Sequence, residues 1–150
     1  MALSNSEIIL KIIKYCDYQE RCHKEVKNKL YELGCNTNEV DEITVLLIEK
    51  GILNEERFAK AFAGGKHRIK KWGKIKIKYE LKQRGITEYC IKKALSEIDE
   101  QKYFETLNEL VKKMNIRKND FKTIQKTIKW LMSKGYEIYL IKNAIELNQK

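Results

Sequence analysis

The chain has 150 residues, enough for one domain or for two or three very small ones, so a large multidomain enzyme is excluded. Proline is absent, 43% of the residues are hydrophobic, and 35% are charged, against about 25% in an average domain. This composition favours a folded, mostly helical protein over a disordered tail or a turn-rich β-sandwich. The net charge of +10 favours a polyanion or an acidic protein surface as the binding partner.

The apolar N-terminal segment is interrupted by Lys11 and Lys14, where a signal peptide needs an unbroken apolar stretch. No part of the chain approaches the ~18 uninterrupted apolar residues of a membrane span. The sequence therefore predicts a cytoplasmic protein that does not contact a membrane. The four cysteines lack Cys-x-x-Cys spacing, and His23 and His67 lie outside any paired ligand pattern, so we expect no metal and no cofactor.

One pattern occurs three times in the chain, at intervals of about fifty residues. In each copy a Leu stands four residues before a Gly, and a β-branched apolar residue stands six residues after that Gly. The three glycines are Gly34, Gly85 and Gly135. The pattern predicts a helix that ends at a left-handed glycine, a short connection and a second amphipathic helix.

Extended over the whole chain, this pattern predicts three helices in each repeat. The expected helices lie near residues 6–16, 23–33, 38–50, 55–70, 74–84, 88–98, 100–115, 121–134 and 138–147. The three repeats occupy residues 1–52, 53–99 and 100–150. Because small units joined in sequence contact mainly their neighbours, we expect an elongated, all-α monomer.

Residues 74–79 alternate Lys with Ile or Tyr, a pattern that by itself is typical of a strand. The repeat favours a helix instead, since Ile77 and Leu81 correspond to Val26 and Leu30 of the first copy. We therefore predict a helix here.

Three segments together resemble a known family. A nine-residue motif at residues 51–59, Gly-Ile-Leu-Asn-Glu-Glu-Arg-Phe-Ala, resembles the most recognisable motif of the RecX family of bacterial recombinase regulators. Upstream, residues 21–30 are similar to a family segment in which Arg-Ser precedes Glu-Leu and a later Lys-Leu. Downstream, residues 72–86 and 131–136 are similar to the signatures of the second and third family repeats. The resemblance covers residues 8–147 in the correct order and spacing.

The resemblance implies a protein of tandem three-helix units that binds the RecA recombinase filament on single-stranded DNA. It implies restraint of filament growth, ATPase and strand exchange, and no catalysis by the chain itself. Two positions depart from the family pattern. Cys22 stands where a Ser cap is usual, which weakens a helix start, and Lys134 stands where Arg is frequent, which keeps the charge but not a bidentate contact.

Most of the net charge lies in one stretch, residues 66–84, which we call the basic segment. It has a single acid, Glu80, and nine cations: Lys66, Arg68, Lys70, Lys71, Lys74, Lys76, Lys78, Lys82 and Arg84. These side chains are candidates for contact with DNA phosphates or with an acidic filament groove. Trp72 and Tyr79 are candidates for stacking on unpaired bases. The alternative is a solvated basic face with both aromatic rings in the core.

Three residues outside the basic segment are candidates for contact with a protein partner. Arg57 is charged within an otherwise apolar motif, so it either pairs with a neighbouring glutamate, Glu55 or Glu56, or faces the partner. Trp130 and Tyr136 flank the turn of the third repeat, where they form either an exposed aromatic anchor or part of the packing at a helix junction.

The sequence contains no Ser/His/Asp grouping, no P-loop and no carboxylate pair beside metal ligands, so we expect no catalytic site. Gly64 and Gly65 lack the preceding strand of a phosphate loop and predict a loosened helix or a hinge. Two other functions stay open. A sequence-specific duplex DNA-binding regulator needs base-reading side chains on the helices after the repeat glycines, which carry few of them. The second open function is a helical scaffold that binds an acidic protein without DNA.

Overall fold

The computed structural model describes residues 3–149, and every regular element within that range is a helix. The elements are α1 (Asn5–Tyr18), α2 (His23–Glu32), α3 (Thr37–Glu49), α4 (Glu55–Gly65), the π-helical turn η1 (Lys66–Lys70), α5 (Lys74–Gln83), α6 (Glu88–Ser96), α7 (Glu100–Lys112), α8 (Phe121–Ser133) and α9 (Ile138–Asn148). The all-α prediction is confirmed.

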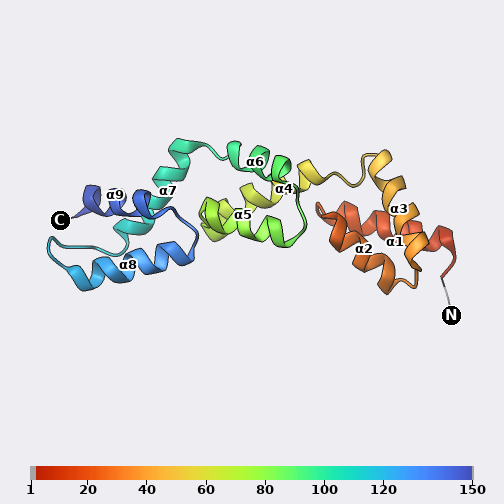
Figure 1. Ribbon diagram of the computed structural model, residues 1–150, viewed down its shortest axis with the longest axis horizontal. Helices are drawn as coiled ribbons and strands as arrows, with labels where there is room; N and C mark the ends of the chain where they lie inside the picture. Colours follow the sequence, from red (N-terminus) through yellow and green to blue (C-terminus); the bar gives the residue numbers. More distant parts are fainter. Residues whose placement is uncertain (1–2, 150) are drawn as a thin grey trace.

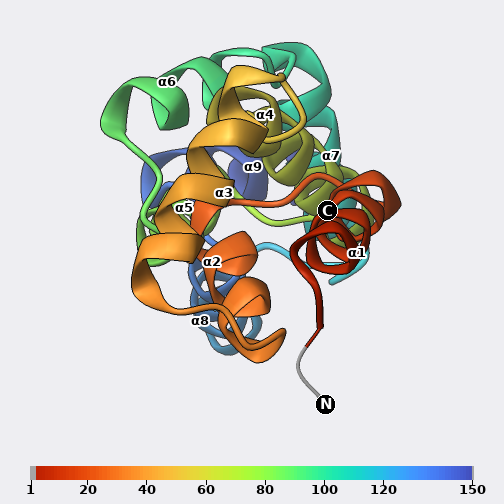
Figure 2. The same cartoon turned by 90° about the vertical axis from the view of Figure 1, so that its right-hand side faces the viewer.

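The helices form three successive groups, α1–α3, α4–α6 and α7–α9, which we call the first, second and third units. Figure 1 shows the units side by side along one long axis, with the two termini at opposite ends of the molecule. Seen along that axis, the first unit lies in front of the other two (Figure 2). The predicted elongated arrangement of tandem three-helix repeats is confirmed.

Local sequence signals begin and end these helices as expected. Asn36 and Glu39 form a capping box, in which each side chain accepts a hydrogen bond from the backbone N–H of the other residue, at 2.9 and 3.0 Å. The second helix of each unit ends near a glycine in the left-handed region, with φ of +97°, +75° and +98° at Gly34, Gly85 and Gly135. A residue with a Cβ is strained in that conformation, which explains the glycine of each repeat.

Residues 74–83 form a helix, as the repeat predicts and the alternation of lysines does not. Ile77 and Leu81, one turn apart, are both fully buried, whereas Ile75 is 55% exposed. The helical chain also continues past Gly64 and Gly65, and it changes there from α-helical to π-helical geometry in η1. The glycines therefore mark a widened helix and not a break.

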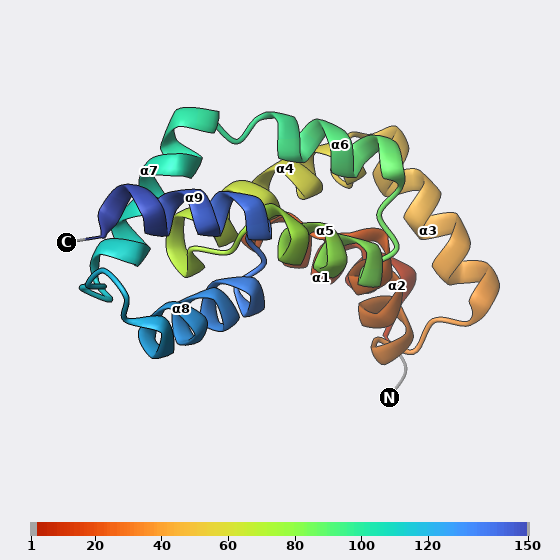
Figure 3. The same cartoon turned by 60° about the vertical axis from the view of Figure 1, so that its left-hand side comes forward.

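The buried apolar residues form two separate cores. One lies within the first unit and includes Ile12, Leu30 and Leu47. The other is shared by the second and third units, extends from Phe58 in α4 to Ile145 in α9, and includes one residue of the first unit, Cys22. Within the second unit, α4 packs side by side with α6 (Figure 3). The second and third units are therefore more closely joined to each other than the first unit is to either.

Candidate nucleic-acid interface

The basic segment runs from the end of α4 through η1 and then along α5. Lys71 ends η1 in the left-handed region with φ +60°, which turns the chain before α5 begins. This turn gives the cations two different surroundings. Arg68, Lys70, Lys71, Lys78 and Lys82 are exposed, and the other four are half-buried.

Only part of the positive charge of the segment is compensated within the described residues. Lys78 and Lys82 both pair with Glu88 at the start of α6, at 3.6 and 3.9 Å. Arg84 pairs with Glu80 at 3.6 Å. The other six cations form no ion pair among residues 3–149, and their charge is available to an external anion.

The two aromatic residues of the segment differ in accessibility. Trp72 is half-buried against the shared core, and the Nζ atoms of Lys66 and Lys76 lie 5.1 and 4.7 Å from its ring centroid. Two lysine ammonium groups therefore lie within cation–π distance of the Trp72 ring at the surface. Tyr79 is 59% exposed on α5, so the alternative that places its ring in the core is wrong for this residue. Its ring is free to stack on a base.

Backbone hydrogen bonds join the beginning of α5 to the end of α8. The N–H of Gly73 donates to the carbonyl of Lys134 at 2.7 Å, and the N–H of Ile75 donates to the carbonyl of Gly135 at 2.9 Å. Lys134 Nζ also donates to the carbonyl of Lys70 at 3.1 Å. We call this contact between the second and third units the α5–α8 junction.

Buried aromatic side chains support the α5–α8 junction from inside. Tyr103 donates its hydroxyl to the Glu137 carboxylate at 2.6 Å and accepts from the N–H of Lys74 at 3.0 Å. Its ring lies 5.3 Å from those of His67 and Tyr136, measured between centroids. Burial, followed by the bond to Glu137, raises the pKa of Tyr103 well above its usual value. This hydroxyl stays protonated and serves to position the backbone of α5.

The structure corrects the exposed-anchor interpretation of Tyr136. The side chain is 1% exposed, and its hydroxyl donates to the carbonyl of Lys71 at 2.8 Å, so it packs at the junction and does not face a partner. Trp130 is half-buried against the shared core, with Lys134 Nζ 5.8 Å from its ring centroid. The sequence showed both aromatics beside a turn but not that a neighbouring unit covers that turn.

Arg57 forms an ion pair, but with a different partner from the predicted Glu55 or Glu56. Its Nε lies 2.6 Å from a carboxylate oxygen of Glu20, in the connection between α1 and α2, and its guanidinium also donates to the carbonyl of Ile52 at 3.0 Å. The side chain therefore links the first unit to the second. Sequence distance hid this contact, because the two residues are 37 positions apart.

The sequence interpretation omitted one group of cations on α8. Lys122, Lys126 and Lys129 are all exposed and follow a spacing of four and three residues, which places them on one face of the helix. We call them the lysine stripe. Helical periodicity of lysines in a segment without a single acid was the signal that could have revealed it.

Within residues 3–149, no three His, Cys, Asp or Glu side chains are grouped so that they could hold a metal ion. No helix in the same range is long and apolar enough to cross a membrane.

Comparison with known proteins places the chain in a family. Residues 54–95 match the family model described as RecX, second three-helix domain. A Regulatory protein RecX from Clostridium botulinum (strain Eklund 17B / Type B) is 30% identical over 153 residues, which cover 96% of this chain and 71% of that protein. The chain belongs to the RecX family. It is accordingly a RecX-family regulatory protein, and the resemblance noted from its motifs is confirmed.

Other RecX proteins extend the comparison. The RecX protein of Clostridium perfringens (strain 13 / Type A) is 34% identical over 122 residues, and the match covers 78% of this chain but only 57% of that protein. The chain thus spans little more than half the length of several RecX relatives. A crystal structure of RecX from Lactobacillus salivarius is similar, with a TM-score of 0.84 and 24% identity over 95% of both chains. This likeness supports the fold.

The two departures from the RecX pattern have local explanations. Cys22 is 1% exposed and packs into the core shared by the second and third units. Its backbone N–H still donates to the Glu25 carboxylate at 3.2 Å, which keeps half of the capping box. Lys134 makes one hydrogen bond, to the carbonyl of Lys70, which an ammonium group provides as well as a guanidinium.

Proposed function

We propose that this RecX-family protein is a non-enzymatic regulator that binds the RecA filament on single-stranded DNA and restrains filament growth, ATPase and strand exchange. Membership of the RecX family supports the regulatory class. The elongated row of units supports a partner with an extended surface, since tandem repeats present such surfaces to their ligands.

The observation that carries the proposal is the uncompensated charge of the basic segment. Six of its nine cations form no ion pair within residues 3–149. Arg68, Lys70 and Lys71 are the most accessible of these, because they follow one another in the exposed turn around η1. Phosphate oxygens neutralise such cations and release counterions, which drives binding to nucleic acids.

The distribution of charge between the units supports the same function. Residues 1–52 contain seven Lys or Arg against nine Asp or Glu, whereas residues 53–150 contain 24 against 12. A polyanion therefore attracts the second and third units and not the first. This polarity would direct the first unit away from the DNA.

The duplex DNA-binding alternative receives no support from the positions of the cations. In a helix-turn-helix protein, the third helix of each unit would enter the major groove. Helix α3 carries four acids and no Lys or Arg, α9 carries a single Lys, and α6 carries two, Lys92 and Lys93. The basic segment and the lysine stripe lie instead in and beside η1, α5 and α8, which favours contact with a phosphate backbone over reading of bases.

The proposal is tested with RecA, single-stranded DNA and ATP, by following ATP hydrolysis as the protein is added. The wild-type protein is expected to inhibit hydrolysis at stoichiometric levels. We expect the R68Q/K70Q/K71Q variant to inhibit less and, because three phosphate contacts are lost, to show a slope of log K against log salt with DNA that is smaller by about 2. Lys74 is left unchanged, because its Nζ lies over the Tyr103 ring.

A matched control removes three charges from the first unit. Lys11, Lys14 and Lys50 are exposed, and K11Q/K14Q/K50Q should keep both inhibition and the wild-type salt slope. If the wild-type protein has no effect on ATP hydrolysis, the proposed function is wrong. If the R68Q/K70Q/K71Q variant keeps the wild-type slope but loses inhibition, the segment contacts the recombinase and its assignment to DNA fails.

A further inference from the structure

Helix α8 has the features of a second surface for a polyanion. It contains no Asp or Glu, and the lysine stripe forms no ion pair within the described part of the chain. The three lysines line a shallow surface hollow of about 560 Å³, together with Gln125, Ile128 and Met132. Phe121, 70% exposed, stands at the far end of the helix. Lysines beside exposed apolar side chains suit the backbone and bases of a single strand.

The α5–α8 junction fixes the position of this surface relative to the basic segment. Two backbone hydrogen bonds tie Gly73 and Ile75 to Lys134 and Gly135. Lys76 is in direct contact with Gly135, since a Cβ placed on that glycine would overlap it. The end of α8 therefore meets the beginning of α5, and the two helices cannot move independently.

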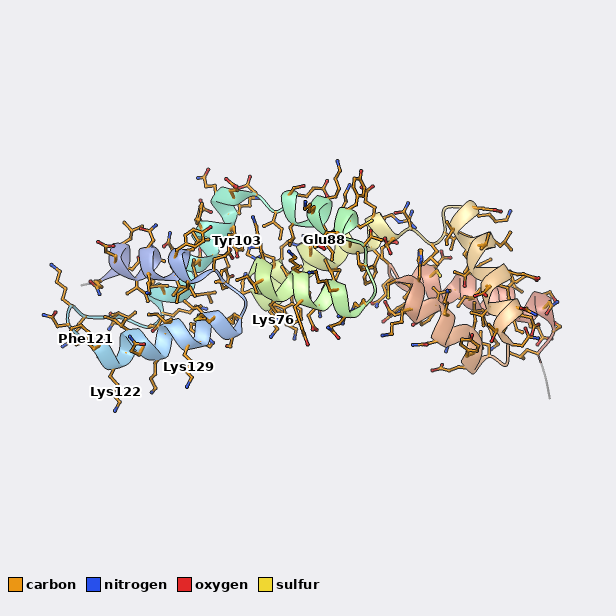
Figure 4. All side chains as sticks on the ribbon, viewed as in Figure 1. Lys76, Glu88, Tyr103, Phe121, Lys122 and Lys129 are labelled. Carbon is orange, nitrogen blue, oxygen red and sulfur yellow. The ribbon has the colours of Figure 1, made fainter. Side chains whose placement is uncertain are left out.

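One lysine of the basic segment lies on the same side of the molecule as two lysines of the stripe. In Figure 4, Lys76 on α5 and Lys122 and Lys129 on α8 all extend to the lower side of the view. Helix α8 has 13 residues and is therefore about 20 Å long at the 1.5 Å rise of an α-helix. A strand bound along α5 would reach the lysine stripe by continuing in the same direction.

Several lysines also lie near one another at the α5–α8 junction, between the basic segment and the lysine stripe. Burial lowers the pKa of Lys134, and the charges of Lys76, Lys113 and Lys70 lower it further. These four lysines come from four parts of the chain: η1, α5, the end of α7 and the end of α8. A phosphate group at this point would relieve their mutual repulsion.

We infer that the single-stranded DNA surface crosses the α5–α8 junction and continues along the lysine stripe of α8. The inference rests on the proposed function and assigns it a longer surface. The second and third units then act as one preorganised binding surface, because their shared core and backbone contacts hold it before DNA arrives.

The test compares K122Q/K126Q/K129Q with the wild-type protein and with the K11Q/K14Q/K50Q control, which loses the same charge. Binding to a fluorescent oligothymidylate is measured by anisotropy over a series of salt concentrations. The stripe variant should lose about 2 from the slope of log K against log salt, or roughly a hundredfold in affinity at 0.1 M salt, and the control should lose neither. All three proteins should have the same thermal unfolding midpoint, because the changed side chains are exposed.

The outcomes separate this inference from the proposed function. If the stripe variant keeps the wild-type slope while R68Q/K70Q/K71Q loses part of it, the surface ends in the second unit and the inference is wrong, although the proposed function stands. Equal losses in the stripe variant and in the first-unit control would show an effect of net charge alone and would also overturn it. If the wild-type protein shows no salt-dependent binding to the oligothymidylate, both fail.

Discussion

The residues that decide the shape of the interface are buried tyrosines and not the cations themselves. Tyr103 positions the N–H of Lys74, and Tyr136 positions the carbonyl of Lys71, so the two hydroxyls hold both ends of the turn between η1 and α5. Burial raises the pKa of both hydroxyls. Both hydroxyls therefore stay protonated at neutral pH in the folded protein.

This burial predicts a loss of stability in alkaline solution. In the unfolded chain, Tyr136 releases its proton above its ordinary pKa of 10.0, whereas in the folded protein the raised pKa keeps the proton bound. The stabilising contribution is present below pH 10 and is lost as the pH rises above it. Between pH 8 and pH 11 the wild-type free energy of unfolding should fall by about 1.4 kcal/mol more than that of Tyr136→Phe. Urea unfolding at both pH values measures this difference, and equal losses would contradict it.

At the scale of elements, the α5–α8 junction depends on two glycines that meet across it. A Cβ on Gly73 would overlap the backbone of Gly135, and a Cβ on Gly135 would overlap Lys76. Gly135 also has a φ of +98°, so it serves both as the end of α8 and as the contact point for α5. The repeat explains the first role, and only the packing of the units explains the second.

Gly85 offers a matched control for the second role. It has a φ of +75° but open space around its Cβ position. It lies in the second unit, which shares its core with the unit of Gly135. Gly85→Ala should lower the free energy of unfolding by roughly 1–2 kcal/mol, from backbone strain alone. Gly135→Ala should cost a further 1–3 kcal/mol or so, because the methyl group forces α5 and α8 apart. Denaturant unfolding measures both values, and equal costs would show that the close approach is not needed.

At the scale of the whole molecule, charge and packing divide the chain in the same place. The first unit has its own core and a small excess of acids, and the other two share a core and carry 24 of the 31 Lys and Arg residues. The exposed ion pair of Arg57 with Glu20 joins the two parts. Under the proposed function, the second and third units bind DNA while the first unit faces outward.

The row of units predicts a scattering profile unlike that of a sphere. A compact protein of this length would have a radius of gyration of roughly 15 Å. Small-angle X-ray scattering should give a clearly larger value, together with the mass of a monomer. A radius at or below 15 Å, or a dimeric mass, would contradict the elongated monomer.

The helices, their grouping into three repeats and the basic segment could all be predicted from the sequence. Caps such as Asn36 with Glu39, and left-handed glycines such as Gly85, act within a few residues, so their effect can be predicted without a structure. The repeat also predicted correctly that residues 74–79 are helical. The family motifs identified the same protein class as the later comparisons.

Only the tertiary structure shows which of these residues are accessible and which of them contact one another. The sequence did not show that Tyr136 is buried beside Lys71, that Arg57 pairs with Glu20, or that the end of α8 bonds to the beginning of α5. Each of these contacts joins residues of different units that are at least 37 positions apart, so it exists only in the packed tertiary structure. Helical periodicity fixes the face on which a side chain lies, but the packing of units determines what that face meets.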